Sequence, residues 1–224
     1  MAAVESHGMK RAAGALAVCL ALVVPPARAV DHPCEVDLWS AAEKHLSGGP
    51  LTWDLPAVGK WRVSRRAVGG RIREGCGLGV IEAPLSVVRD VIDTAADFDQ
   101  FMPRVLESDV EPVSPGVYLN RQILDMPFPV EDRRYTVRVE TGVVETGAGI
   151  GWRARWTYVE GSGNVRESRG SWTLIPLDSQ RTVVVYRLLT DPGGRLPAWI
   201  IDFTAPRALR RVLASVRERV LGRK

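Results

Sequence analysis

The sequence predicts an α+β fold in which a curved antiparallel β-sheet wraps around a long C-terminal α-helix. Segments that alternate apolar and polar residues follow one another from residue 105 to residue 189, with Gly, Pro or Asn between them. Their connections are too short for the crossovers that parallel strands need. A long amphipathic segment then follows the last strand, and its apolar stripe can cover the concave face of such a sheet.

The first 29 residues have the layout of a secretory signal peptide. Lys10 and Arg11 precede an apolar run over residues 12–24, and Ala27 and Ala29 form an A-x-A cleavage site. The run is shorter than the roughly 20 residues that span a bilayer, which disfavours an uncleaved anchor. We therefore expect a signal peptide at residues 1–29, one domain at residues 30–224, and an exported protein that is periplasmic or secreted.

Two cysteines, Cys34 and Cys76, lie outside this signal. In an oxidising compartment such a pair usually forms a disulfide, which would tie the start of the mature chain to a strand. Two free buried thiols are the alternative, because sequence does not show how close the two residues come. The chain has no CxxC motif and no histidine after His45. We therefore predict no metal and no cofactor.

The charge balance argues against a nucleic-acid partner. The chain has 30 Lys and Arg against 26 Asp and Glu. The charges are mixed along the sequence, and no basic run with interleaved aromatic residues occurs.

The predicted elements follow from periodicity and from turn residues. Before the sheet we expect a helix at Glu35–Leu46, a hairpin of Trp61–Val68 and Arg71–Ile81 around Gly69 and Gly70, a helix at Ala83–Asp93, and a shorter helix that Thr94 caps and Pro103 ends. The following strands are Val105–Val113, Val117–Leu124, Arg133–Val144, Ile150–Val159, Val165–Ile175 and Thr182–Leu189. The last helix covers residues 196–222, with a possible kink at Pro206.

Three glycines of the second hairpin strand, Gly75, Gly77 and Gly79, fall on one face by the period of two. Either another element approaches this backbone closely or the strand bends there. Further on, Pro127 and Pro129 give no N–H to a strand ladder, so the strand that ends at Leu124 has to stop before the next begins.

Four motifs in this order resemble the START lipid-transfer domains and the wider superfamily of START-like polyketide cyclases and ligand-binding proteins. They are FDQFMPRVLESDVE (residues 98–111), MPFPVEDRRYTV (126–137), GSWTLIPL (170–177) and DPGGRLPAWI (191–200). The set is similar to bacterial START-domain proteins with secretion signals. The resemblance implies the helix-grip fold and a START-like lipid-binding domain at residues 30–224.

The sequence departs from the family pattern at two positions. Arg134 stands where the family's DRDY motif has an acidic residue, which puts any ion pair of that carboxylate in doubt. In sterol-carrying members an arginine points into the cavity six residues after the first arginine of this motif, and here that position is Val139. Recognition of a sterol hydroxyl by that arginine is therefore not expected.

Strand parity predicts which side chains face the helix and could line a ligand cavity. Most are aromatic or aliphatic, and the polar exceptions are Asn120, Gln122 and Tyr186, which suits an apolar ligand with one oriented polar end. The predicted ligand-binding residues are Tyr118, Asn120, Gln122, Leu124, Tyr135, Val137, Val139, Trp152, Trp156, Trp172, Val184, Tyr186 and Leu188 from the strands, with Ile201 and Ala205 from the last helix.

The predicted function is non-enzymatic binding and transport of a lipid or sterol-like molecule, with transient membrane contact. The predicted inner faces carry no His, Cys, Lys, Asp or Glu that could act as acid, base or nucleophile, so we predict no catalytic residue. A polyketide cyclase or aromatase is the alternative, since such relatives work mainly by cavity shape. A third reading is an interaction domain whose interior is filled by its own side chains.

Overall fold

The computed structural model of the chain describes residues 55–69, 72–126, 128, 130–146, 149–161, 165–191 and 198–222. Its strands are β1 (Trp61–Gly69), β2 (Ile72–Ile81), β3 (Val105–Ser114), β4 (Val117–Leu124), β5 (Arg133–Thr146), β6 (Gly149–Gly161), β7 (Glu167–Pro176) and β8 (Thr182–Asp191). Its helices are α2 (Leu85–Asp93), the 3-10 turn η1 (Ala95–Asp97), α3 (Phe98–Phe101) and α4 (Ala198–Val220). The predicted order of elements from the hairpin onward is confirmed.

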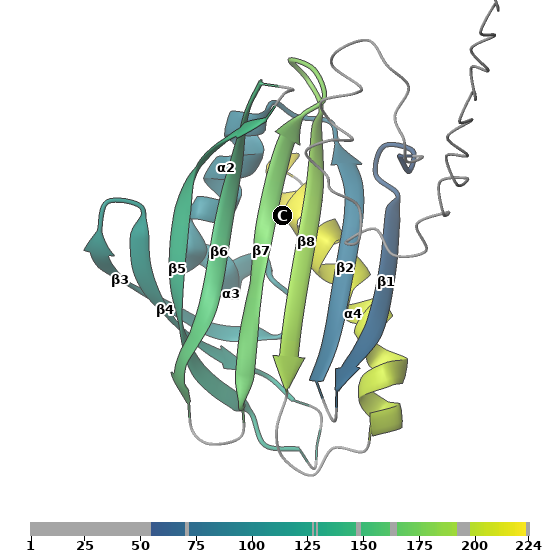
Figure 1. Ribbon diagram of the computed structural model, residues 1–224. Coiled ribbons are helices and arrows are strands. Elements are labelled where there is room, and N and C mark those ends of the chain that lie inside the picture. The colour runs from purple at the N-terminus through teal and green to yellow at the C-terminus, as the bar shows by residue number, and fades with distance from the viewer. Residues whose placement is uncertain are drawn as a thin grey trace, which may run out of the picture.

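All eight strands form one curved antiparallel sheet in the order β1-β2-β8-β7-β6-β5-β4-β3. Strands β3 to β8 pair with their sequence neighbours, and the β1–β2 hairpin joins the far edge through β8. Figure 1 shows α2, α3 and α4 on one face of this sheet. The predicted α+β helix-grip fold, with a curved antiparallel sheet and a long C-terminal helix, is therefore what the chain adopts.

Close approach of side chains to a bare backbone explains the glycine row of β2. A Cβ atom at Gly75 would lie 2.8 Å from Cδ1 of Leu209, and one at Gly77 would overlap Cδ1 of Leu213. Both leucines belong to α4. A Cβ at Gly79 would overlap the indole of Trp61 on β1. The glycines thus let α4 and the indole of Trp61 lie directly on the backbone of β2, as the first of the two readings of the sequence expects.

Side-chain ion pairs fix the second half of α4. Arg217 binds Glu82 through both its Nε, at 2.8 Å from Oε2, and its Nη2. Arg219 reaches Asp97 at 3.2 Å, and its guanidinium lies 5.5 Å from the ring centre of Phe101. The helix contains Pro206, which has no N–H to donate to the preceding turn.

One local prediction was wrong. Thr94 precedes η1, but its side chain makes no capping bond to the turn that follows. Its hydroxyl donates instead to the backbone carbonyl of Asp90 at 2.8 Å, one turn back in α2. A threonine between two helical segments can bond in either direction, and here it closes the first segment.

The outward face of β2, β7 and β8 is also buried. Its apolar members include Leu78, Val80, Ile175, Val183 and Val185.

Cys76 belongs to this face and is fully buried, whereas Cys34 lies outside the described residues. So do the expected signal peptide and the expected helix at Glu35–Leu46, and the disulfide stays a prediction. Among the residues that the structure describes, no helix is long and apolar enough to cross a membrane.

Candidate functional site

The candidate site is the concave face of the sheet, where the helices cover it. Most of the predicted ligand-binding residues of the strands belong to the hydrophobic core on this face or pack against it: Tyr118, Tyr135, Val137, Val139, Trp152, Trp156, Trp172, Val184 and Tyr186. Asn120 is buried, and Gln122, Leu124 and Leu188 are half-buried. Ile201 and Ala205 lie in α4, but their side chains are not among those described.

A stack of three aromatic rings occupies the middle of this face. Tyr186 on β8 lies between Trp172, with ring centres 4.2 Å apart, and Trp156, with ring centres 5.7 Å apart. The indole of Trp156 lies over Gly170, where any side chain would overlap it. The rings therefore lie close to the sheet, and the hydroxyl of Tyr186 bonds to no residue that the structure describes.

A chain of hydrogen bonds crosses β5, β4 and β3 beside this stack. Tyr135 donates its hydroxyl to Oε1 of Gln122 at 2.8 Å, and Nε2 of Gln122 donates to Oγ of Ser108 at 3.4 Å. Ser108 also lies 2.8 Å from the carbonyl oxygen of Ala95 in η1 and 3.1 Å from the amide of Asn120. Polar groups of the strands are thereby connected to the helical segment above them.

Burial keeps the phenols of this site neutral. Loss of water raises the pKa of Tyr135, and it raises the pKa of Tyr186, with Tyr135 as the lesser cause. Burial also raises the pKa of Tyr118, helped by the negative charge of Asp93 at the end of α2. All three hydroxyls are therefore hydrogen-bonding groups rather than anions near neutral pH.

The sequence analysis missed three residues of the site. The alternation of β3 predicts the face on which Ser108 lies. It does not predict that Ser108 is buried, because a single serine in a polar strand gives no such signal. Gly170 is opposite Trp156 in the register, which only the pairing of β6 with β7 reveals. Arg133 shares the parity of Tyr135 and is buried, and its guanidinium donates to the carbonyl oxygen of Glu131 at 2.7 Å. Parity could have placed this arginine inside.

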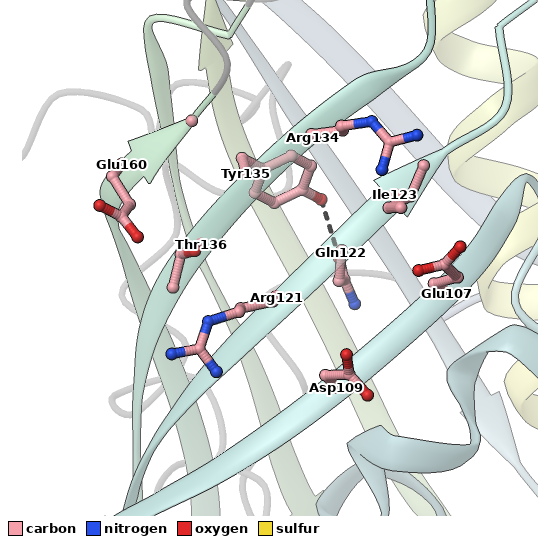
Figure 2. Close-up of a pocket in the computed structure, with 10 residues that line it drawn as sticks. Glu107, Asp109, Arg121, Gln122, Ile123, Arg134, Tyr135, Thr136 and Glu160 are labelled. Atoms are coloured by element: carbon pink, nitrogen blue, oxygen red, sulfur yellow. Dashed lines mark hydrogen bonds between the residues drawn. The ribbon is translucent and has the colours of Figure 1, made fainter.

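A pocket of about 370 Å³ lies where β3, β4, β5 and the end of β6 run side by side, and its lining includes Gln122 and Tyr135 (Figure 2). Asp109, Arg121, Thr136 and Glu160 form one row across these strands, as their pairing requires. Other lining residues include Glu107 and Arg134, so half of the lining is charged. This lining does not suit a hydrophobic ligand, and we do not assign the ligand site here.

Metal ligands are not grouped at either place. Among the described ranges, no cluster of three or more His, Cys, Asp or Glu could hold a metal ion. Val139, at the position of the family's cavity arginine, is buried in the core. The site therefore offers an apolar wall with the hydrogen-bonding groups of Tyr135, Gln122 and Asn120, and with the buried Arg133 at its end.

The family model described as "Polyketide cyclase / dehydrase and lipid transport" matches residues 81–217. This range runs from the end of β2 into α4 and is more than half of the chain. The protein therefore belongs to this START-like family. A curated relative, the uncharacterized protein PA1579 of Pseudomonas aeruginosa, is 36% identical over 83 residues. The match covers 35% of this chain and 41% of that protein, less than half of its length.

Solved structures agree on the fold. The STAR-related lipid transfer protein of Xanthomonas axonopodis is 26% identical with a TM-score of 0.62, covering 71% of this chain and 93% of that one. Human StAR-related lipid transfer protein 5 is 16% identical, with a TM-score of 0.60. The match covers 83% of this chain and 97% of that one. The Zhui aromatase/cyclase of Streptomyces sp. R1128 is 16% identical, with a TM-score of 0.52. The match covers 73% of this chain and 96% of that one.

Proposed function

We propose that this protein binds and carries one hydrophobic molecule, a lipid or sterol-like compound, between the sheet and α4. The observation that carries the proposal is the composition of the concave face. An aromatic stack lies beside buried polar groups, and the hydroxyl of Tyr186 has no partner among the described residues. Tyr186 is half-buried, and its hydroxyl is not among the fully enclosed side-chain atoms that lack a partner, so it is open to a guest molecule or to water.

Two further findings support a carrier. The family includes lipid transport in its description, and the Xanthomonas and human relatives are named as lipid transfer proteins. The sequence predicts no acid, base or nucleophile on the inner strand faces. The structure shows one charged residue on this face that the sequence analysis missed, the buried Arg133. Its guanidinium donates to the backbone carbonyl oxygen of Glu131.

Lipid extraction tests the proposal directly. The protein would be purified from its own host without detergent and measured by native mass spectrometry. We expect a mass excess of one lipid-sized molecule, which organic extraction removes and a lipid panel restores. A protein that carries nothing and binds none of the panel would contradict a carrier function.

A cyclase or aromatase is the second candidate, because the Zhui aromatase/cyclase has the same fold. The paired side chains of Tyr135 and Gln122, and the hydroxyl of Tyr186, would be the polar groups available to such an enzyme. The predicted export argues against it, since polyketide substrates are tethered to cytoplasmic carriers. Turnover by the purified protein that Tyr186→Phe or Gln122→Leu abolishes would replace the carrier proposal with an enzyme.

Transient membrane contact is part of the proposal, and Phe128 is the residue we assign to it. Its side chain is 98% exposed in the connection between β4 and β5. The strand register places this connection at the same end of the sheet as the end of β8, from which the chain continues toward α4. Insertion of one phenylalanine into a bilayer surface contributes about 1–3 kcal/mol.

Vesicle transfer tests the role of Phe128. Phe128→Ser is expected to slow the transfer of a lipid between vesicles several-fold and to leave the affinity for that lipid unchanged. Val143→Ser is the matched control, because Val143 is also an exposed apolar residue, on β5 near the opposite end of the sheet. Equal transfer rates for the two variants would remove Phe128 from the membrane contact.

We also propose export, on the evidence of the sequence alone. The basic start, the apolar run and the small residues at Ala27 and Ala29 support it. N-terminal sequencing of the protein from the periplasmic or secreted fraction should begin at Val30. Intact protein found only in the cytoplasm would contradict the proposal.

A further inference from the structure

The buried amide of Asn120 defines the kind of polar group that the ligand carries. Asn120 is 3% exposed and lies on the concave face of β4, between Tyr118 and Gln122 in the alternation of that strand. One end of its amide lies 3.1 Å from Oγ of Ser108. The other end bonds to no residue among those that the structure describes. This end is not among the fully enclosed side-chain atoms that lack a partner, so it is open to a bound molecule or to water.

The single proton of the Ser108 hydroxyl decides which end of the amide is free. Oγ lies 2.8 Å from the carbonyl oxygen of Ala95, and two oxygen atoms at that distance need a proton between them. The serine therefore donates to Ala95 and has only lone pairs left for its other neighbours. Nε2 of Gln122 donates to one lone pair, since Oε1 of Gln122 already accepts the Tyr135 hydroxyl.

The remaining neighbour of Ser108 must then be the NH₂ group of Asn120. The oxygen and nitrogen of an asparagine amide occupy interchangeable positions, and the partners determine which is which. With the NH₂ group toward Ser108, the carbonyl oxygen of Asn120 points away from the network as an acceptor without a donor. The chain of bonds from Tyr135 to Ala95 holds it in this orientation.

We propose that the carbonyl oxygen of Asn120 accepts a hydrogen bond from an uncharged O–H or N–H group of the bound lipid. This inference rests on the proposed carrier function and specifies its ligand. A long-chain alcohol, a monoacyl or diacyl glycerol, or a sterol has the required donor. A carboxylate or an ether offers only lone pairs to this oxygen, so both are disfavoured.

Three probes with one chain length test the inference: hexadecanol, hexadecyl methyl ether and hexadecanoate. Binding to the purified protein is measured through the quenching of its tryptophan fluorescence, because Trp156 and Trp172 lie on the same face. We expect hexadecanol to bind about tenfold more tightly than the ether, as one lost buried hydrogen bond predicts. In Asn120→Leu the two affinities should become equal.

Ser108→Ala tests whether Ser108 acts as a positioning residue. Its removal releases the Asn120 amide, so the preference for the alcohol should shrink while the affinity for the ether stays the same. Ser171→Ala is the matched control, because Ser171 points to the opposite face of β7 from Trp172 and should keep the full preference. Thermal unfolding of each variant shows that the fold is retained.

The outcomes separate the two proposals. If none of the three probes binds, and the lipid panel does not bind either, the carrier function fails and the ligand assignment fails with it. Equal binding of all three probes, or a preference that survives Asn120→Leu, overturns the assignment of the polar group alone.

Discussion

The glycines of β2 lack side chains, and this allows α4 to pack closely against the strand. Because Leu209 and Leu213 occupy the space where Cβ atoms would stand, α4 lies closer to β2 than ordinary side chains would allow. Leu213 is fully buried and belongs to the hydrophobic core. The sequence predicts that something special happens at this row, but it does not identify the partner, since α4 is more than a hundred residues further along.

Gly77→Ala tests this contact at the scale of one methyl group. The added Cβ would overlap Leu213, and overpacking of this kind costs on the order of 1–3 kcal/mol. Urea unfolding should show that loss of stability. Gly142→Ala on β5 is the control, because no atom lies within 4 Å of the Cβ that it adds. Equal stability of the two variants would mean that α4 does not rest on β2 as described.

The residue scale also marks what sequence reasoning can and cannot find. Alternation places Tyr135, Val137 and Trp172 on the inner face, since burial of one face requires a period of two. The acceptor role proposed for Asn120 could not be predicted from the sequence, because it depends on the contacts of Ser108 with Ala95 and Asn120, which the fold brings together. The sequence predicts that Asn120 is a polar residue of the inner face, and only the fold shows which residues surround it.

At the scale of elements, the described ion pairs of α4 lie in its second half. The two-point contact of Arg217 with Glu82 and the contact of Arg219 with Asp97 join the helix to the end of β2 and to η1. Side chains of α4 that precede Pro206 are not described, and Pro206 removes one helical hydrogen bond at that point.

Arg217→Lys tests the anchor of this helix. Lysine keeps the charge but cannot make the two-point contact with Glu82, so we expect a loss of about 1 kcal/mol in the free energy of unfolding. Arg211→Lys, at an exposed position of the same helix, should change nothing. A loss that is the same for both variants would assign the effect to helix propensity and not to the ion pair.

Most element boundaries could be predicted because local signals mark them. Pro103 ends α3, and the prolines after Leu124 separate β4 from β5, as their chemistry requires. The direction in which Thr94 bonds could not be predicted, since threonine serves both the end of one helix and the start of the next. The pairing of β8 with β2 was not predicted, because neither strand carries a residue pattern that identifies the other as its partner.

At the scale of the whole molecule, the predicted bond between Cys34 and Cys76 would join the start of the mature chain to β2. Cys76 is fully buried on the outward face of β2. A disulfide closing a loop of about 40 residues would stabilise the fold by roughly 4 kcal/mol. Cys76→Ser and Cys34→Ser should therefore each lower the midpoint of thermal unfolding, and reduction of the wild type should lower it similarly.

Peptide mapping without reductant checks the bond itself. A cross-linked peptide that contains both cysteines is expected in the mature protein and should disappear on reduction. Alkylation of both thiols in the unreduced, unfolded protein would instead establish two free cysteines, and each serine variant would then lose stability only by its change in packing.

The packing of α4 on β2 also limits how this helix can move, because Leu209 contacts Gly75 and Leu213 contacts Gly77. Four residues of a helix advance about 6 Å, and two residues of a strand advance about 6.6 Å. The two spacings match closely enough for both leucines to fit neighbouring gaps at once. Sliding along the strand would lift both leucines together, whereas swinging about these two points keeps them in place. If the proposed carrier releases its ligand by a movement of α4, we expect the helix to pivot about these two leucines and not to slide along β2.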